Sequence, residues 1–226
     1  MRKSFRLVGL TGLHGAGKDT VADILVAHCG FTKISFAQPL YSEVAEAFEL
    51  DLSALIDRAT KEIPTAALAL QRCVSKPFIN AITSDHFLRK AAMDTAEPRS
   101  PRQILQWWGT EFRRRHFGVW YWTDIARRRM TYMLRERLAQ RFVISDCRFE
   151  NEVAMVRNDF GGVLWQIVGQ APVDAGQHAS AVDGSAFKPD LILNNSHTIR
   201  HLQQLVLAEV WAADAGLKKV RVEIED

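Results

Sequence analysis

Cysteine is scarce in this sequence of 226 residues, which contains only Cys29, Cys73 and Cys147 and no C-x-x-C pair. An odd number of widely spaced cysteines argues against a disulfide framework and against a zinc site. We therefore expect three buried thiols in a reducing cytoplasm. Long apolar runs are also lacking: none approaches the roughly 18 residues of a membrane-spanning helix, so we expect no membrane partner.

Lysine is absent from residues 99–148, a span that contains twelve arginines and the four acidic residues Glu111, Asp124, Glu136 and Asp146. Twelve against four leaves a local net charge of +8, so the rest of the chain carries −5 of the total of +3. Arginine without lysine favours planar, bidentate recognition of phosphate. The alternative is a solvated basic surface, with nucleic acid as a partner.

Short apolar runs alternate with helical patterns along the chain. The apolar runs predict strands at 5–11, 32–37, 141–146, 163–168, 190–193 and 219–224. The helical patterns predict helices at 18–29, 41–48, 52–59, 100–115, 122–140, 150–158 and 198–213. This alternation predicts an α/β fold in which helices cover both faces of a parallel sheet. We expect one domain over residues 1–226, with a helical insertion at about 38–140.

The helix at 100–115 should begin with Ser100 as its cap and Pro101 in its first turn. At 100° per residue, two faces separate along it. One face carries Arg102, Gln106, Gly109 and Arg113, and the other carries Ile104, Leu105, Trp108 and Phe112. We expect the apolar face to pack on a core and the polar face to line a cleft or meet solvent.

The segment from Gly12 to Lys18 matches G-x-x-x-x-G-K and lies between a predicted strand and a predicted helix. In such a loop, backbone N–H groups surround phosphates, the helix N-terminus adds positive potential and the lysine reaches the β- and γ-phosphates. The candidate ATP-binding residues are Gly12, His14, Gly15, Ala16, Gly17, Lys18, Asp19 and Thr20.

Three residues are candidates for holding magnesium. Asp19 follows the loop lysine, where Ser or Thr usually binds the ion, and Thr20 comes next. Asp19 could act through a water molecule or Thr20 could supply its hydroxyl, and spacing does not decide between them. Asp146 ends a predicted strand, where it would orient magnesium or, alternatively, cap the next helix.

Further candidates follow other predicted strands. Arg148 would stabilise charge on a transferring phosphoryl group or form a surface ion pair with Glu150 or Glu152. Asn194 and Asn195 would contact adenine or form an ordinary turn.

Aromatic residues gather in the arginine-rich span, at Trp107, Trp108, Trp120, Tyr121 and Trp122. Aromatic rings beside arginines suit a base stacked near its phosphate, although such rings also form cores. His178 lies in the predicted loop at 169–188, where it is either a ligand residue or an ordinary structural histidine.

With these residues in place, the sequence resembles the phage-type deoxynucleoside monophosphate kinases, relatives of the nucleoside monophosphate kinases within the P-loop fold. The matching stretches are 9–23, 35–40, 100–102, 105–106, 109–111, 145–152, 178–180 and 190–195, and they cover most of the chain outside about 50–98. Two positions depart from the family pattern, because Tyr41 stands where the family has Lys and Ala181 where it has Glu.

The resemblance implies a three-layer P-loop fold and phosphoryl transfer from ATP, with Mg²⁺, to a deoxynucleoside monophosphate. On this reading the catalytic residues are Lys18, Asp146, Arg148, Arg113 and Arg114. The acceptor-binding residues are Ser35, Phe36, Ala37, Leu40, Arg102, Gln106, Trp107, Glu111 and His178.

Two other functions fit the same motifs. One is another small-molecule P-loop kinase, such as one acting on dephospho-coenzyme A. The other is a nucleotide-gated protein that binds nucleic acid through the arginine-rich span. We expect small-molecule nucleotides as partners of a cytoplasmic protein with no stable nucleic-acid partner, and we leave a homodimer open.

Overall fold

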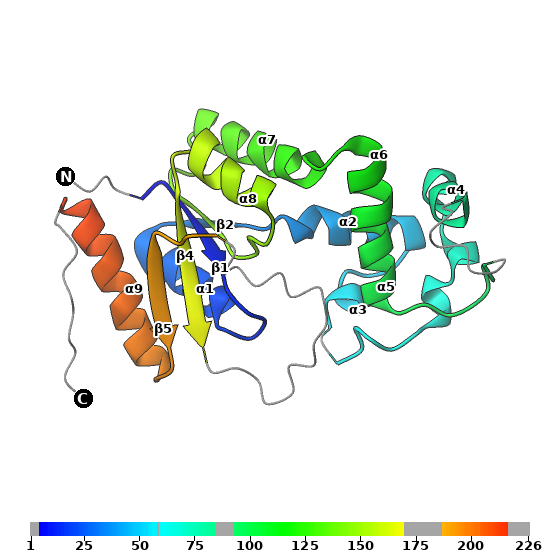
Figure 1. Cartoon of the computed structure of the whole chain (residues 1–226), viewed down its shortest axis with the longest axis horizontal. Helices are drawn as coiled ribbons and strands as arrows, with labels where there is room; N and C mark the ends of the chain where they lie inside the picture. The colour runs from blue at the N-terminus through cyan, green and yellow to red at the C-terminus, as the bar shows by residue number, and fades with distance from the viewer. Residues whose placement is uncertain (1–4, 58, 85–92, 170–186, 217–226) are drawn as a thin grey trace. The chain divides into compact units, whose positions relative to one another are not determined.

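Five parallel strands form one sheet in the order β2-β3-β1-β4-β5. The strands are β1 (Leu7–Thr11), β2 (Thr32–Ile34), β3 (Phe142–Ile144), β4 (Val163–Gly169) and β5 (Leu191–Asn195). The computed structural model describes residues 5–57, 59–84, 93–169 and 187–216 (Figure 1). In the central strand β1, all five residues are buried, as a strand covered on both faces requires.

Helices cover both faces of this sheet. On one face, Val8 and Leu10 of β1 pack among buried residues of α1 (Lys18–Cys29) and α9 (Ile199–Asp214). On the other face, Leu7 packs with residues of α8 (Glu150–Ala154), of the π-helix η4 (Met155–Asp159) and of the C-terminal part of α7 (Tyr121–Arg135). The predicted α/β fold with a covered parallel sheet is confirmed.

The described chain divides into two compact units. The sheet unit comprises Met1–Phe36 and Ala126–Asp226, and the helical unit comprises Ala37–Ile125. The helical unit begins where we expected the insertion to begin, but it ends at Ile125 rather than near residue 140.

The helical unit is built from short helices around its own apolar core. Its elements are α2 (Ala37–Phe48), α3 (Ser53–Ile56), the 3₁₀ turns η1 (Ala66–Leu68) and η2 (Leu70–Arg72), α4 (Lys76–Ser84), α5 (Pro101–Gln106), the π-helix η3 (Trp107–Arg114) and α6 (Arg115–Phe117). The rings of Phe78, Trp108 and Phe112 lie at the centre of this core, with centroids 4.5 to 5.6 Å apart. Aromatic packing of this kind adds stabilisation beyond burial of apolar area.

Several predicted boundaries differ from those observed. The helix expected at 122–140 ends at Arg135, because Arg137 adopts a positive φ of 56° and the Leu138 N–H bonds back to the Met133 carbonyl oxygen at 2.9 Å. The helix expected at 52–59 is confined to Ser53–Ile56, because Asp57 leaves the helical conformation with a φ of −57° and a ψ of 120°. The strand expected at 219–224 and His178 lie outside the described residues.

None of the three cysteines forms a disulfide, and Cys73 and Cys147 are buried whereas Cys29 is partly exposed. Among the described residues, no helix is both long enough and apolar enough to cross a membrane.

Candidate active site

Residues 12–17, which we call the phosphate loop after their sequence motif, join β1 to α1. Two glycines of this loop adopt backbone conformations that other residues rarely adopt. Gly12 has a φ of 136°, and a Cβ there would lie 2.3 Å from the Ile167 carbonyl oxygen. Gly17 has a φ of 99°, and a Cβ there would lie 2.3 Å from the Asn195 side-chain nitrogen. Both positions are closed to other residues by conformation and by space. The loop therefore follows a path along β4 and β5 that only glycine permits.

Lys18 is the first residue of α1, and its ammonium folds over the loop. Its Nζ donates hydrogen bonds to the carbonyl oxygens of Gly12 at 2.8 Å and Leu13 at 2.7 Å. His14 and Gly15 are exposed at the tip of the loop. The lysine thus lies where it can reach the phosphates of a nucleotide held by the loop.

Asn195 braces the phosphate loop from β5. Its side-chain nitrogen donates a hydrogen bond to the Ala16 carbonyl oxygen at 3.0 Å. We expected Asn194 and Asn195 to contact adenine or to form an ordinary turn. Both belong to β5, so they form no turn, and the Asn195 amide supports the loop. Asn194 is exposed, as alternation along a strand predicts.

Asp19 lies next to a lysine of the neighbouring strand. Lys33 Nζ approaches Asp19 Oδ1 at 3.1 Å and Asp23 Oδ1 at 3.0 Å. Burial acts to lower the pKa of Lys33, but its hydrogen bonds to Asp23 and Asp19 outweigh burial, and the pKa lies above its ordinary value. Lys33 is therefore held as a cation beside the carboxylate that follows the loop lysine, while Thr20 is partly buried.

Asp146 follows β3 at the edge of the sheet where the phosphate loop follows β1, since the two strands pair in parallel. Its Oδ2 accepts a hydrogen bond from the Ser35 hydroxyl at 2.7 Å, and its Oδ1 accepts one from the Phe36 N–H at 3.0 Å. The carboxylate therefore fixes the segment that enters α2, a contact that the sequence did not predict beside magnesium binding or a cap on the following helix. Ser35 and Phe36, which we expect at the acceptor, both donate hydrogen bonds to Asp146.

The oxygen atoms near the loop fit a magnesium ion. No group of three or more His, Cys, Asp or Glu side chains that could hold a metal forms in the part of the chain that the structure describes. Magnesium does not need one, because it is typically bound through one or two carboxylates and the phosphates of the substrate. The carboxylate of Asp146 offers oxygen atoms of the kind that magnesium prefers.

Arg148 extends into solvent from a backbone that a buried carboxylate anchors. Glu152 is 2% exposed, and its Oε2 accepts hydrogen bonds from the N–H groups of Arg148 at 2.7 Å and Phe149 at 3.0 Å. The expected alternative was an ion pair of the Arg148 side chain with Glu150 or Glu152, and none forms among the described residues. Sequence analysis missed this role of Glu152, although a Glu in the first turn of a helix is a known capping signal.

The expected acceptor residues of the helical unit occupy different environments. Arg102 is exposed and paired with Glu62, and Gln106 is exposed. Trp107 is only 8% exposed and lies beneath the Arg99 guanidinium, with 5.3 Å between the guanidinium carbon and the ring centroid. Glu111 pairs with Arg115 at 3.9 Å. The remaining candidates are Ala37 at the start of α2, Leu40 beside Gly109, and Arg114, which is half-buried.

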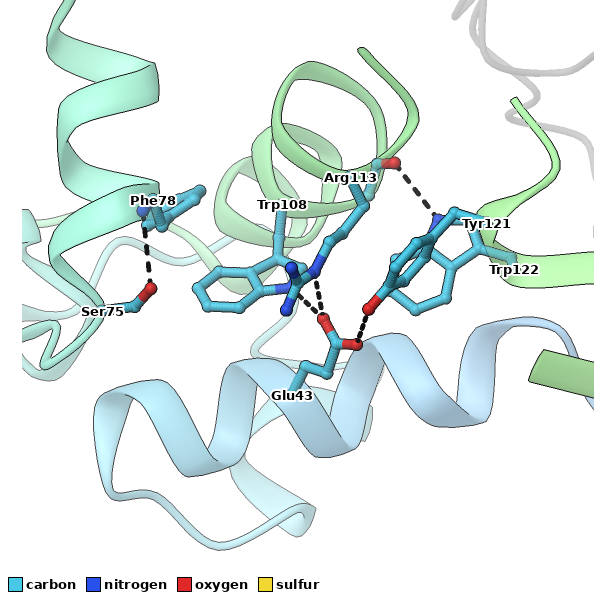
Figure 2. A network of polar contacts seen from close by, with 8 residues as sticks. Glu43, Ser75, Phe78, Trp108, Arg113, Tyr121 and Trp122 are labelled. Atoms are coloured by element: carbon cyan, nitrogen blue, oxygen red, sulfur yellow. Dashed lines mark hydrogen bonds and ion pairs between the residues drawn. The ribbon is translucent and has the colours of Figure 1, made fainter. Parts of the chain in front are cut away.

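Arg113 does not lie on a separate polar face. Its Nε donates to Glu43 Oε2 at 2.6 Å, and Trp108 Nε1 donates to the same oxygen at 2.7 Å (Figure 2). Gly109 is buried against Leu40. The expected polar stripe does not simply face a cleft or solvent at Gly109 and Arg113, because Gly109 packs against Leu40 and Arg113 Nε bonds to Glu43, both on α2.

Tyr121 completes this network by donating its hydroxyl to Glu43 Oε1 at 2.7 Å. Burial and the hydrogen bond to Glu43 raise the pKa of Tyr121 to about 12. The hydroxyl therefore remains a donor at neutral pH. Glu43 is not among the residues predicted from the sequence, because its partners lie 65 to 78 residues away along the chain.

No protein-family model matches the chain. A protein of Acanthamoeba polyphaga mimivirus, provisionally named deoxynucleotide monophosphate kinase, is 28% identical over 204 residues, which are 89% of this chain and 94% of the relative. The chain is similar to a deoxynucleotide monophosphate kinase. The resemblance seen in the sequence is thus confirmed over most of both chains.

A dephospho-CoA kinase from Campylobacter jejuni is a neighbour among solved structures. It shares 14% sequence identity with a TM-score of 0.46, over 93% of this chain and 98% of the neighbour. The name of the mimivirus relative supports a phosphotransferase.

Proposed function

We propose that this protein transfers the γ-phosphoryl group of ATP to a deoxynucleoside monophosphate and releases the diphosphate. The phosphate loop is the observation that carries the proposal, because Gly12, Gly17 and Lys18 have the conformations that hold a nucleotide's phosphates. The viral relative supports a deoxynucleotide as the acceptor.

The proposed reaction requires little proton transfer by the protein. The attacking atom is a phosphate oxygen of the monophosphate, which is already anionic at neutral pH, so no strong general base is required. Catalysis is then positioning and neutralisation of charge. Lys18 holds the donor phosphates, and Arg148, Arg113 and Arg114 are the candidates for binding the transferring and acceptor phosphates.

Magnesium bound with ATP would be held by Asp146 together with Asp19 or Thr20. When bound, the ion offsets the negative charge that the donor phosphates carry and develop. Asp146 also orients Ser35 and Phe36. We assign acceptor binding to the helical unit and to residues 35–40.

A panel of deoxy- and ribonucleoside monophosphates, assayed with ATP and magnesium for release of ADP, tests the proposal. We expect turnover that a deoxynucleoside monophosphate stimulates. Lys18→Ala should reduce it at least about a hundredfold, the usual scale for losing one preorganised charged contact. Lys188→Ala is the matched control, because Lys188 is an exposed lysine of the same unit.

The same assay separates the alternatives. If dephospho-coenzyme A stimulates turnover and no monophosphate does, the acceptor is dephospho-coenzyme A and not a deoxynucleoside monophosphate. Salt-dependent binding of a DNA duplex, without monophosphate-stimulated turnover, would favour a nucleic-acid-binding protein. Near-normal turnover in Lys18→Ala would overturn the assignment of the phosphate loop.

A further inference from the structure

Glu43 is a half-buried carboxylate that receives three side-chain donors. Its Oε2 accepts from Arg113 Nε and Trp108 Nε1, and its Oε1 accepts from the Tyr121 hydroxyl, at 2.6 to 2.7 Å (Figure 2). We propose that Glu43 and Tyr121 are positioning residues, which aim the terminal nitrogens of Arg113 at the phosphate of the acceptor. The inference rests on the proposed function and extends it to residues outside the phosphate loop.

Arg113 is held rigidly along most of its length. Its guanidinium carbon lies 4.7 to 5.6 Å from the ring centroids of Trp108, Phe112, Phe117 and Tyr121. Cation–π contacts of this kind favour one orientation of the guanidinium plane. With the rings around it and Nε bonded to Glu43, the group has lost much of its rotational freedom, which lowers the cost of ordering it around a ligand.

The end of the Arg113 guanidinium is not used by the protein. Only Nε bonds to Glu43, and the two terminal nitrogens have no hydrogen-bond partner among the described residues. The Arg113 side chain is 20% exposed, and the one buried unpartnered side-chain polar atom found in the described chain is Nε of Arg99. The terminal nitrogens of Arg113 therefore reach solvent.

This geometry differs from that of an ion pair that serves stability alone. Arginine and carboxylate pair most strongly when two parallel N–H groups face the two oxygens. Here Tyr121 holds one oxygen, while Arg113 approaches the other through Nε alone. The pair of terminal donors is thereby left for a second anion, and a phosphate monoester matches its spacing and charge.

The π-helix explains how one carboxylate reaches both Trp108 and Arg113. Residues five apart in an α-helix differ by about 140° in direction, so the two side chains would diverge. A π-helix closes hydrogen bonds between residues five apart and brings them onto one face. Segments of this kind occur frequently at functional sites, and this one delivers Arg113 to Glu43.

A double-mutant cycle tests the proposal. Binding of a deoxynucleoside monophosphate and of the corresponding nucleoside, which lacks the phosphate, would be measured by calorimetry in wild type, Glu43→Gln, Arg113→Ala and the double variant. Arg113→Ala should weaken binding of the monophosphate roughly tenfold to hundredfold, as expected for the loss of a hydrogen bond to a charged group. Glu43→Gln should weaken it less and should have no further effect in the Arg113→Ala background. Binding of the nucleoside and of ATP should be unchanged.

Glu46→Gln is the matched control, because Glu46 is an exposed glutamate on the same helix, and it should change nothing. Thermal unfolding reports whether each variant folds. If Glu43→Gln fails to fold, Tyr121→Phe replaces it as a milder variant. The proposal is overturned if Glu43→Gln weakens binding of the monophosphate and of the nucleoside equally. It is also overturned if Glu43→Gln further weakens binding of the monophosphate in the Arg113→Ala background.

The same measurements distinguish a failure of the proposed function from a failure of the Arg113 site. A wild type that binds none of the monophosphates contradicts the proposed function. In that case the Arg113 site is judged with inorganic phosphate alone: binding that depends on Arg113 and Glu43 supports the site, and binding that is absent or indifferent to them overturns it.

Discussion

Tyr121 and Glu43 form a contact in which one proton decides whether the two oxygens attract or repel. While the Tyr121 hydroxyl is protonated it donates to the carboxylate at 2.7 Å, but a phenolate would place two anions at that distance. Burial, which disfavours the charged phenolate, and then the hydrogen bond to Glu43 and its negative charge raise the pKa of Tyr121 to about 12. The contact is therefore stable at neutral pH and sensitive to strong base.

The titration of Tyr121 can be observed directly. Because its pKa in the folded protein lies above the unfolded value of about 10, the contact stabilises the fold fully below about pH 10 and loses that effect as pH rises towards 12. The phenolate absorbance of wild type minus that of Tyr121→Phe should therefore rise near pH 12. In Glu43→Gln the rise should move to lower pH, and a rise near pH 10 in wild type would contradict the assignment.

Residues of the candidate site differ in how visible they are in the sequence. Lys18 and its loop could be predicted because the motif is local and its flanking strand and helix are periodic. Glu43 could not be predicted, since its three partners are distant along the chain. Nor could the part played by Lys33, because only the neighbouring position of β2 and α1 brings it to Asp19.

At the scale of elements, the long helix around Trp107 shows where periodicity succeeds and where it fails. The prediction placed a helix over residues 100–115 with Ser100 as its cap, and the Ser100 hydroxyl does accept the Gln103 N–H at 3.2 Å. The assignment of faces assumed 100° per residue throughout. It holds for Trp108 and Phe112, which are buried in the core of the helical unit. It fails for Gly109 and Arg113, which meet Leu40 and Glu43, because nothing local in the sequence shows that α2 packs there.

Ser100→Ala should lower the free energy of unfolding by about 1 kcal/mol, the typical cost of losing a side-chain cap. Urea unfolding followed by circular dichroism measures the change. Ser42→Ala is a suitable comparison, because Ser42 lies exposed within α2, where alanine is favourable to the helix. An equal effect of the two substitutions would show that the Ser100 cap contributes nothing of its own.

At the scale of the whole molecule, the local charge of +8 at residues 99–148 serves more than nucleotide binding. Arginines of this span form ion pairs, within their own unit, with acidic residues outside the span: Arg99 with Glu97, Arg102 with Glu62, Arg113 with Glu43, Arg127 with Asp159 and Arg141 with Asp214. The sequence showed the excess of arginine, but it did not show these partners, which all lie outside residues 99–148. Much of the charge is therefore neutralised locally, and the terminal nitrogens of Arg113 and the exposed side chain of Arg148 are among the groups left for anions.

Removal of magnesium tests how the sheet unit holds ATP. A ligand present at a hundred times its Kd stabilises the folded state by about 2.7 kcal/mol, which is roughly 5–10 °C in Tm for a chain of this length. ATP with magnesium should produce a shift of this size in calorimetry, and ATP with a chelator a smaller one, because Asp146 and Asp19 then repel phosphates that no ion neutralises. Lys18→Ala should reduce the shift in both conditions. If the two units unfold separately, only the transition of the sheet unit should move with ATP, and equal shifts with and without magnesium would contradict a metal site at Asp146.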